Sequence, residues 1–176
     1  MTTSTELKTE LKTAPRIYIA CLASYNNGIL HGEWIVPAAD KDKLYKQINT
    51  IIKSSPMTNA EEWAVHDYDN FPNLGEYPQV EDIILIQEAI TEHGADLVNA
   101  FLTDYQIEDL DRIDEAFCGE WDSFQDFADD MANSIMEIPS HIEPYFDYKN
   151  YAYNLKADYS EIKSNHYTVF IFNNNF

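Results

Sequence analysis

The chain has 176 residues, with 11 Lys and Arg against 31 Asp and Glu, so its formal net charge is −20. This acidity excludes a nucleic-acid-binding protein of the usual basic kind. Hydrophobic residues make up 45% of the chain and aromatic residues 14%, which is too much apolar material for a disordered acidic chain. We therefore expect a folded protein of one or two domains, or of several smaller units.

The N-terminal part predicts a small α+β unit. Residues 16–23 and 28–36 are rich in Ile, Tyr and Trp and flank the polar stretch SYNN, which predicts a β-hairpin. Asp40 is placed to cap a helix that ends before Pro56, and residues 61–69 predict a third strand. The apolar face of the predicted helix consists of Leu44, Ile48, Ile51 and Ile52.

The middle of the chain predicts helices, because its apolar residues recur at spacings of three and four. The first helix begins after Gln79 and ends at Gly94, a typical C-cap residue. A fourth helix is predicted to begin at Asp122 as its N-cap, with Gln125 three residues on. The predicted inward-facing residues are Val80, Ile83, Ile86 and Ile90; Leu97, Val98, Phe101 and Leu102; Ile107, Leu110, Ile113 and Phe117; and Phe124, Phe127, Ala128, Met131 and Ile135.

The C-terminal part is aromatic and predicts a second α+β unit. A helix is expected around Tyr145, Phe146, Tyr148, Tyr151, Ala152 and Leu155, followed by strands at 159–164 and 166–172. The fold class is therefore α+β, with a small α+β unit, an acidic helical middle and a C-terminal α+β unit. We place the domain boundaries at 16–70, 71–117 and 118–176, after a flexible N-terminal extension at 1–15.

Targeting signals and disulfides are not expected. The longest apolar run, residues 17–23, is far shorter than the roughly 18 to 20 residues that cross a bilayer. The first 15 residues carry two glutamates and no apolar core, unlike a signal or transit peptide. Cys21 and Cys118 lie far apart, which favours reduced thiols in a cytoplasmic protein over a disulfide.

The acidity belongs to one stretch of the chain. Residues 57–147 contain 24 acidic side chains and a single fixed positive charge, Arg112, whereas the flanking segments are nearly balanced. Few of these carboxylates can be neutralised within the segment, so they must face water, a metal or a basic partner. A surface that served only for solubility would be of mixed sign.

The sequence offers little for catalysis or for a metal. It has no glycine-rich phosphate loop, no HExxH and no paired CxxC. A calcium loop starting at Asp109 fails, because Ile113 and Asp114 occupy its fifth and sixth positions. Alternation along a strand sends His66 and Asp67 to opposite faces, and the other histidines are isolated. We expect no catalytic residue, metal or cofactor.

The chain resembles the ArdA antirestriction proteins of conjugative elements and phages. The resemblance is carried by residues 16–35 (RIYIACLASYNNGILHGEWI), 61–69 (EEWAVHDYD) and 142–172. It extends over nearly the whole chain after residue 15. It implies an elongated homodimer of three small domains that imitates bent B-form DNA. The chain departs from the family pattern at 152–155, where Ala-Tyr-Asn-Leu replaces Gly-Arg-Asp-Leu, which puts the detailed dimer contact in the C-terminal domain in doubt.

The resemblance implies inhibition by occupancy of the DNA groove of type I restriction-modification enzymes, at their specificity and methyltransferase subunits, without binding nucleic acid or a membrane. Duplex DNA carries one charge per roughly 1.7 Å of axis, so 24 carboxylates match the charge of about 40 Å of duplex. The carboxylates expected to imitate phosphates are Glu81, Asp82, Glu88, Glu92, Asp96, Asp104, Glu108, Asp109, Asp111, Asp114, Glu115, Glu120, Asp122, Asp126, Asp129, Asp130 and Glu137.

Two alternatives to this function stay open at the level of the sequence. The same charge would suit an acidic module that inhibits another DNA-binding protein, such as a CRISPR effector, a nuclease or a nucleoid protein. Clustered carboxylates can also serve a metal-dependent enzyme, which saturable binding of a divalent cation in calorimetry would reveal. Comparative pull-downs would separate the first alternative from inhibition of a restriction enzyme.

Overall fold

The computed structural model describes residues 14–136, 138–164 and 166–176. It divides into two compact units, one ending at Asn99 and the other comprising Ala100–Phe176. Each unit contains helices and one three-stranded antiparallel sheet, which confirms the α+β class. The division into three domains stays a prediction, and most of the predicted N-terminal extension, residues 1–13, lies outside the described residues.

The sheet of the first unit has the order β2-β1-β3, formed by β1 (Arg16–Cys21), β2 (Gly32–Ile35) and β3 (Trp63–Asp69). The antiparallel pairing of the first two strands and the third strand are as predicted. The predicted hairpin is confirmed, but its connection is longer than predicted, because the helical turn α2 (Leu22–Asn26) follows β1 and the second strand begins only at Gly32. Ser24 explains the turn: its buried hydroxyl lies 2.8 Å from that of Ser55, and its carbonyl accepts from Asn27 N at 3.0 Å.

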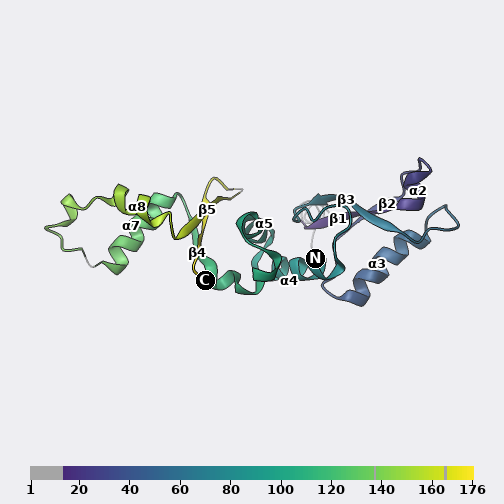
Figure 1. Ribbon diagram of the computed structural model, residues 1–176, viewed down its shortest axis with the longest axis horizontal. Coiled ribbons are helices and arrows are strands. Elements are labelled where there is room, and N and C mark those ends of the chain that lie inside the picture. Colours follow the sequence, from purple (N-terminus) through teal and green to yellow (C-terminus); the bar gives the residue numbers. More distant parts are fainter. Residues whose placement is uncertain (1–13, 137, 165) are drawn as a thin grey trace, which may run out of the picture. The chain divides into compact units, whose positions relative to one another are not determined.

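Helix α3 (Lys41–Lys53) lies along one face of this sheet and contacts β1 and β2 (Figure 1). The predicted cap is confirmed, since the backbone N–H of Lys43 donates to Asp40 Oδ1 at 2.8 Å. All four predicted apolar residues of the helix are buried. Its lysines therefore project from the opposite side, and they are exposed.

Helices α4 (Val80–His93) and α5 (Ala95–Asp104) follow, as the spacing predicts. Val80, Ile83, Ile86 and Ile90 are buried in α4, and Val98 and Phe101 in α5. Gly94 ends α4 with a φ of 87°, a conformation that L side chains rarely adopt. The two-unit boundary falls inside α5.

The predicted third helix at 107–117 is confirmed as helical up to Ala116, but it is not one regular α-helix and it is wrong at Phe117. A 3-10 helix, η1 (Ile107–Arg112), leads into the short α6 (Ile113–Ala116), and Phe117 then begins strand β4 (Phe117–Trp121). The strand pairs with β6 (Val169–Asn173) through an irregular register between Phe117 and Glu120. Gly119 lies in that irregularity with a φ of 111°, so a helix cannot continue through it.

Helix α7 (Phe124–Ile135) is capped by Ser123 rather than by Asp122. The Ser123 hydroxyl oxygen accepts from Asp126 N at 3.2 Å. Phe124, Phe127 and Ala128 are buried as predicted, and Met131 is partly buried. Ile135 was predicted to face inward, but it is 65% exposed at the end of the helix.

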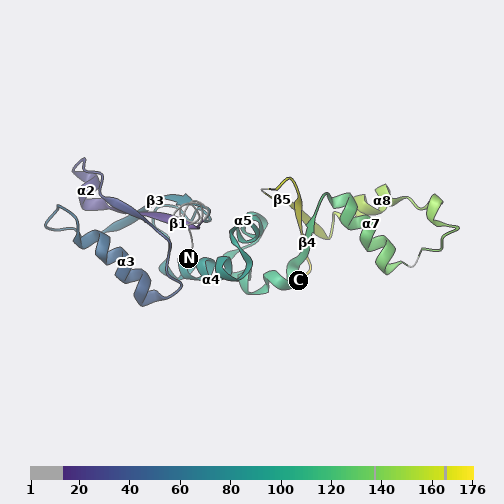
Figure 2. The same cartoon turned by 180° about the vertical axis from the view of Figure 1, so that it is seen from behind.

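The second unit is completed by η2 (Glu143–Tyr145), α8 (Tyr148–Leu155) and β5 (Tyr159–Lys163), with the sheet order β4-β6-β5. The C-terminal helix begins later than predicted, because Asp147 caps it through Asn150 N at 3.0 Å and leaves Tyr145 exposed. Helices α7 and α8 lie side by side (Figure 2).

Both faces of β6 are buried. Val169 and Ile171 pack with α7 and α8, whereas Phe170 and Phe172 contact the ring of Phe117. Both cysteines are free, as predicted. No helix in the described ranges is long and apolar enough to cross a membrane.

Candidate functional site

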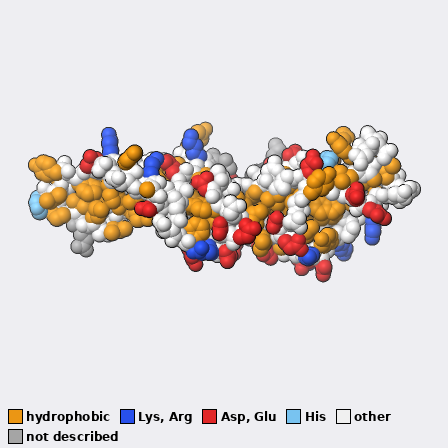
Figure 3. Space-filling view, viewed as in Figure 1, with side chains coloured by type: hydrophobic (Ala, Val, Ile, Leu, Met, Phe, Trp, Pro, Cys, Tyr) orange, Lys and Arg blue, Asp and Glu red, His pale blue; other side chains and the backbone are white. Residues whose placement is uncertain are grey.

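The predicted phosphate-like carboxylates lie on the protein surface. Apart from Glu137, which lies outside the described residues, none is buried: twelve are exposed and Asp82, Asp96, Asp109 and Asp129 are partly exposed. On the face drawn in Figure 3, Asp and Glu side chains stand among uncharged surface and are more numerous than the Lys and Arg side chains, which appear at several places between them. The 16 described carboxylates are therefore open to water or to a partner.

Helix α4 aligns three of these carboxylates along one side. Glu81, Glu88 and Glu92 are exposed at spacings of seven and four residues, opposite the buried isoleucines. This places them in one row. At a rise of 1.5 Å per residue the row is about 16 Å long, which gives a mean spacing of roughly 8 Å between neighbouring charges. One strand of DNA carries a charge every 3.4 Å or so of axis, so a match to DNA needs several elements.

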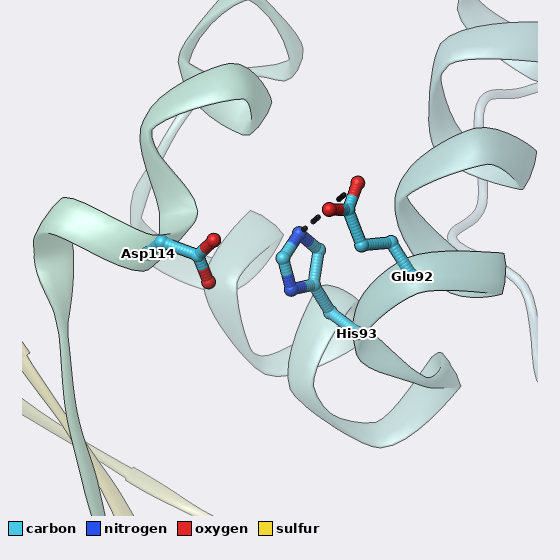
Figure 4. A group of neighbouring side chains, drawn as sticks. All are labelled: Glu92, His93 and Asp114. Carbon is cyan, nitrogen blue, oxygen red and sulfur yellow. Dashed lines mark ion pairs between the residues drawn. The ribbon is translucent and has the colours of Figure 1, made fainter.

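Both ends of α4 carry local charge contacts. Glu81 lies at the N-terminal end, where the helix dipole favours an anion, and its carboxylate accepts from Lys41 Nζ at 2.5 Å. The Lys41 ammonium lowers the pKa of Glu81, so this carboxylate stays ionised. At the C-terminal end His93 Nε2 lies 3.9 Å from the carboxylate of Glu92, as the dashed line in Figure 4 shows.

In the second unit, η1 and α6 repeat the pattern of one buried and one acidic side. Leu110 and Ile113 are buried, whereas Glu108, Asp111 and Glu115 are exposed. Asp109 is part of the cap of η1 and accepts from Gln106 N at 3.2 Å. The helical stripe predicted here is thus confirmed as far as Ile113, and it leaves the carboxylates outward.

Arg112, the single fixed positive charge of the acidic segment, is already engaged. Its Nε donates to Glu115 at 3.1 Å, and its guanidinium lies 5.0 Å from the ring centroid of Phe176. It can therefore neutralise only one neighbouring carboxylate. Six of the exposed candidate carboxylates form neither an ion pair nor a side-chain hydrogen bond with any residue that the structure describes: Glu88, Asp104, Glu108, Asp111, Asp122 and Asp130.

Helix α7 and strand β4 position the remaining acids. Asp126 and Asp129 are fixed by short contacts, to the Ser123 hydroxyl at 2.5 Å and to Gln125 Nε2 at 2.6 Å. The hydroxyl of Thr168 donates to Glu120 on β4. Because these side chains are held by hydrogen bonds, they present charge in fixed positions, which lowers the entropy lost on binding.

The sequence-based selection missed other exposed acids in the same segment. Glu61, Glu62, Asp67, Glu76, Glu143 and Asp147 are also exposed. The selection followed predicted helices, whereas most of these residues lie in strand β3 or in loops. The charge imbalance of residues 57–147, which includes all six, was the signal that could have found Asp67 and Glu76, the two of them that line a cavity of the first unit.

Helix α3 carries positive charge, in contrast to the acidic elements described above. Lys41, Lys43, Lys46 and Lys53 are all exposed there, and among them only Lys41 forms an ion pair with a described residue. This helix is therefore an unsuitable surface for a basic partner. A basic partner would be directed to the acidic elements that follow it in sequence.

Comparison with known proteins gives one family. The family model described as "Antirestriction protein (ArdA)" matches residues 17–168. A search of curated proteins gives no match. Since the family model covers most of the sequence, including all the acidic elements above, the chain belongs to the ArdA antirestriction protein family.

Proposed function

We propose that this antirestriction protein imitates B-form DNA and blocks the DNA-binding groove of type I restriction-modification enzymes, thereby protecting incoming mobile DNA. The observation that carries the proposal is the acidic segment, with 24 acidic side chains and one arginine. None of its 16 described candidate carboxylates is buried. The proposed partner surface is the groove formed by the specificity and methyltransferase subunits, in the cytoplasm.

The proposed mechanism is competition with DNA for the cationic groove, driven by the same release of counterions. A groove that binds DNA neutralises phosphates with Lys and Arg, and binding releases condensed counterions. A surface with 24 carboxylates carries the charge of roughly a dozen base pairs, and a homodimer would double it. Inhibition then needs occupancy alone, so no catalytic residue, metal or cofactor takes part.

The predicted homodimer and the three-domain division belong to this proposal. Exposed apolar side chains support a contact in the C-terminal part, because large apolar side chains at a surface are typical of interfaces. Ile135, Met136, Ile142 and Tyr145 are all at least 46% exposed and lie close together in sequence. A dimer through this segment would add a second acidic array to the first.

Competition binding tests the proposal. The purified protein is titrated into a type I methyltransferase core bound to a labelled duplex, at two salt concentrations. We expect stoichiometric displacement of the duplex that weakens as salt rises, because the attraction is largely electrostatic. Failure to displace the duplex would contradict the proposed target, and a panel of CRISPR effectors, nucleases and nucleoid proteins would then show whether another DNA-binding protein is inhibited.

A further inference from the structure

A cavity of about 330 Å³ lies beside the end of β3 in the first unit, lined by residues 65–68, Phe71, Asn73, Gly75 and Glu76. The strand is irregular here: Tyr18 pairs with Asp67 but Ile19 pairs with Val65, so His66 is an extra residue in a β-bulge. Bulges are over-represented beside functional sites, where they redirect side chains. The volume is at the lower end of the roughly 300–1,000 Å³ of ligand pockets, which suits a single side chain.

The walls of the cavity are held by internal contacts. The chain folds back after β3, and Val65 N donates to the carbonyl of Glu76 at 2.9 Å. The Tyr68 hydroxyl donates to the carbonyl of Gly75 at 2.5 Å, and Gly75 N donates to Asn73 Oδ1 at 2.8 Å. The cavity is therefore formed before any ligand binds, which reduces the ordering cost of binding.

The cavity combines negative charge with an aromatic wall. Asp67 and Glu76 are exposed, and neither forms an ion pair with a described residue. The neighbouring Asp69, by contrast, is engaged by Arg16 at 2.6 Å. The rings of Tyr68 and Phe71 stack with their centroids 6.3 Å apart. A cation that also has an apolar or flat part would satisfy both features.

The geometry of the cavity favours a guanidinium over a metal ion as the bound cation. No three carboxylate or imidazole ligand atoms of this cavity lie within 4.8 Å of one another, so these residues do not form a three-ligand metal site. His66 is turned toward α2, where its ring packs edge-on against Tyr25 with centroids 4.8 Å apart. A guanidinium is larger, carries five donors in a plane and stacks on aromatic rings. Two carboxylates beside two aromatic rings therefore suit a guanidinium better than a metal ion.

We propose that the cavity between β3 and residues 70–76 receives an arginine side chain of the inhibited enzyme, with its guanidinium at Asp67 and Glu76. This inference rests on the proposed function, because a DNA-binding groove presents arginines that ordinarily contact phosphates. The cavity differs from the carboxylates of α4 to α7 in being a built pocket for one side chain. Its two acids should therefore matter individually, whereas those of the helices act collectively.

The direct test uses Nα-acetyl-arginine amide as the probe, titrated into the full chain and followed by amide NMR shifts. We expect saturable shifts confined to residues 65–76, and shifts at least about threefold weaker at equal concentration with Nα-acetyl-lysine amide, which cannot form the planar fork. The double variant D67N/E76Q should abolish them while keeping the hydrogen bond that Asp67 Oδ1 accepts from Tyr68 N. The control E61Q/E62Q removes the same charge from two exposed residues outside the cavity. The assignment would be overturned if the wild type responded equally to the arginine and lysine probes. It would also be overturned if D67N/E76Q and E61Q/E62Q gave equal shifts with the arginine probe.

The second test uses the methyltransferase core with its bound duplex. D67N/E76Q should require at least about tenfold more protein for displacement than the wild type, and E61Q/E62Q less than about threefold more, since an exposed rim charge contributes little. If the wild type displaces the duplex and the two double variants behave alike, the cavity inference fails and the proposed function stands. If the wild type does not displace the duplex, the proposed function fails, and the arginine titration alone decides the cavity.

Discussion

Phe172 on β6 is the residue around which the aromatic core of the second unit packs. It is fully buried, with its ring centroid 5.5 Å from that of Phe101, 5.8 Å from Tyr105 and 5.7 Å from Phe117. Phe172→Ala should lower the free energy of unfolding by about 3–5 kcal/mol, because it removes apolar burial and leaves a cavity. Urea denaturation measures the loss. Tyr167→Ala, at a fully exposed position, should change it by less than about 0.5 kcal/mol, and equal effects would contradict this packing.

Tyr68 makes the stability of the first unit sensitive to alkaline pH. Burial raises its pKa to about 12 from an ordinary value of 10.0. As the pH rises from 10 towards 12, the unfolded state releases this proton first, so the contribution of Tyr68 is present below pH 10 and is lost across that interval. In Tyr68→Phe the free energy of unfolding should fall less steeply across the same interval. Urea midpoints measured at several pH values give the two slopes, and identical slopes would refute the assignment.

At the scale of single elements, the start of α7 distinguishes two neighbouring residues as caps. Ser123, whose oxygen accepts from Asp126 N at 3.2 Å, holds the cap position. Ser123→Ala should therefore destabilise the protein by about 1 kcal/mol. Asp122→Ala should cost less than about 0.5 kcal/mol, since Asp122 acts on the helix only through its charge. Thermal or urea unfolding measures the loss of stability in the two variants. A larger loss in Asp122→Ala than in Ser123→Ala would identify Asp122 as the cap.

Helices in which apolar residues recur over several turns were predictable from the sequence. Short elements with too few residues to show a period were not. Helices α3 and α4 repeat their buried residues over about two and a half and three turns, and a period of 3.6 residues is then unambiguous. Strand β4 spans five residues, Phe117–Trp121, with an irregular register at Gly119. It has no alternation to detect, because its place is fixed by pairing with β6, about 50 residues later. The turn α2 was hidden for a similar reason, since the buried partner of Ser24 is Ser55, far along the chain.

The same distinction applies to the candidate site. The acidic sides of α4 and α7 followed from the helical period, because residues opposite a buried stripe must face outward. The cavity at Asp67 and Glu76 could not be predicted from any period, because it depends on the bulge at His66 and on a loop that returns to Val65. Strict alternation assigned His66 and Asp67 to opposite faces of a strand, but it gave no sign of the extra residue at His66 or of the cavity beside it. A bulge is the physical reason why a period of two fails there.

At the scale of the whole molecule, the proposed dimer makes a prediction about exposed apolar residues. Ile142 is 46% and Tyr145 86% exposed. If these side chains form the contact between two copies, I142S/Y145S should weaken dimerisation by at least about tenfold, which corresponds to 1.4 kcal/mol or so of lost burial. Analytical ultracentrifugation over a range of concentrations measures this. Leu30→Ser, at an 89% exposed position in the first unit, serves as the control and should leave the dimer intact.

The proposed mimicry predicts that inhibition depends on many carboxylates together. Each exposed ion pair with a Lys or Arg of the enzyme contributes at most about 1 kcal/mol, so neutralising Glu88 or Asp111 alone should weaken binding less than about fivefold. Neutralising all six unpaired candidates, Glu88, Asp104, Glu108, Asp111, Asp122 and Asp130, should cost about 3–6 kcal/mol, roughly a hundredfold or more in affinity. It should also flatten the dependence of affinity on salt, because fewer counterions are released.

The matched control neutralises six exposed acids outside the predicted array: Glu33, Asp42, Glu61, Glu62, Glu143 and Asp158. Both variants change the net charge equally, so an inhibitor that acted only through its total charge would respond equally to the two. Mimicry by a placed array requires the first variant to lose at least about ten times more affinity than the second, measured by displacement of a labelled duplex from the methyltransferase core. A single Asp→Asn substitution that abolished inhibition would contradict a distributed array, because a collective electrostatic surface has no one residue on which it depends.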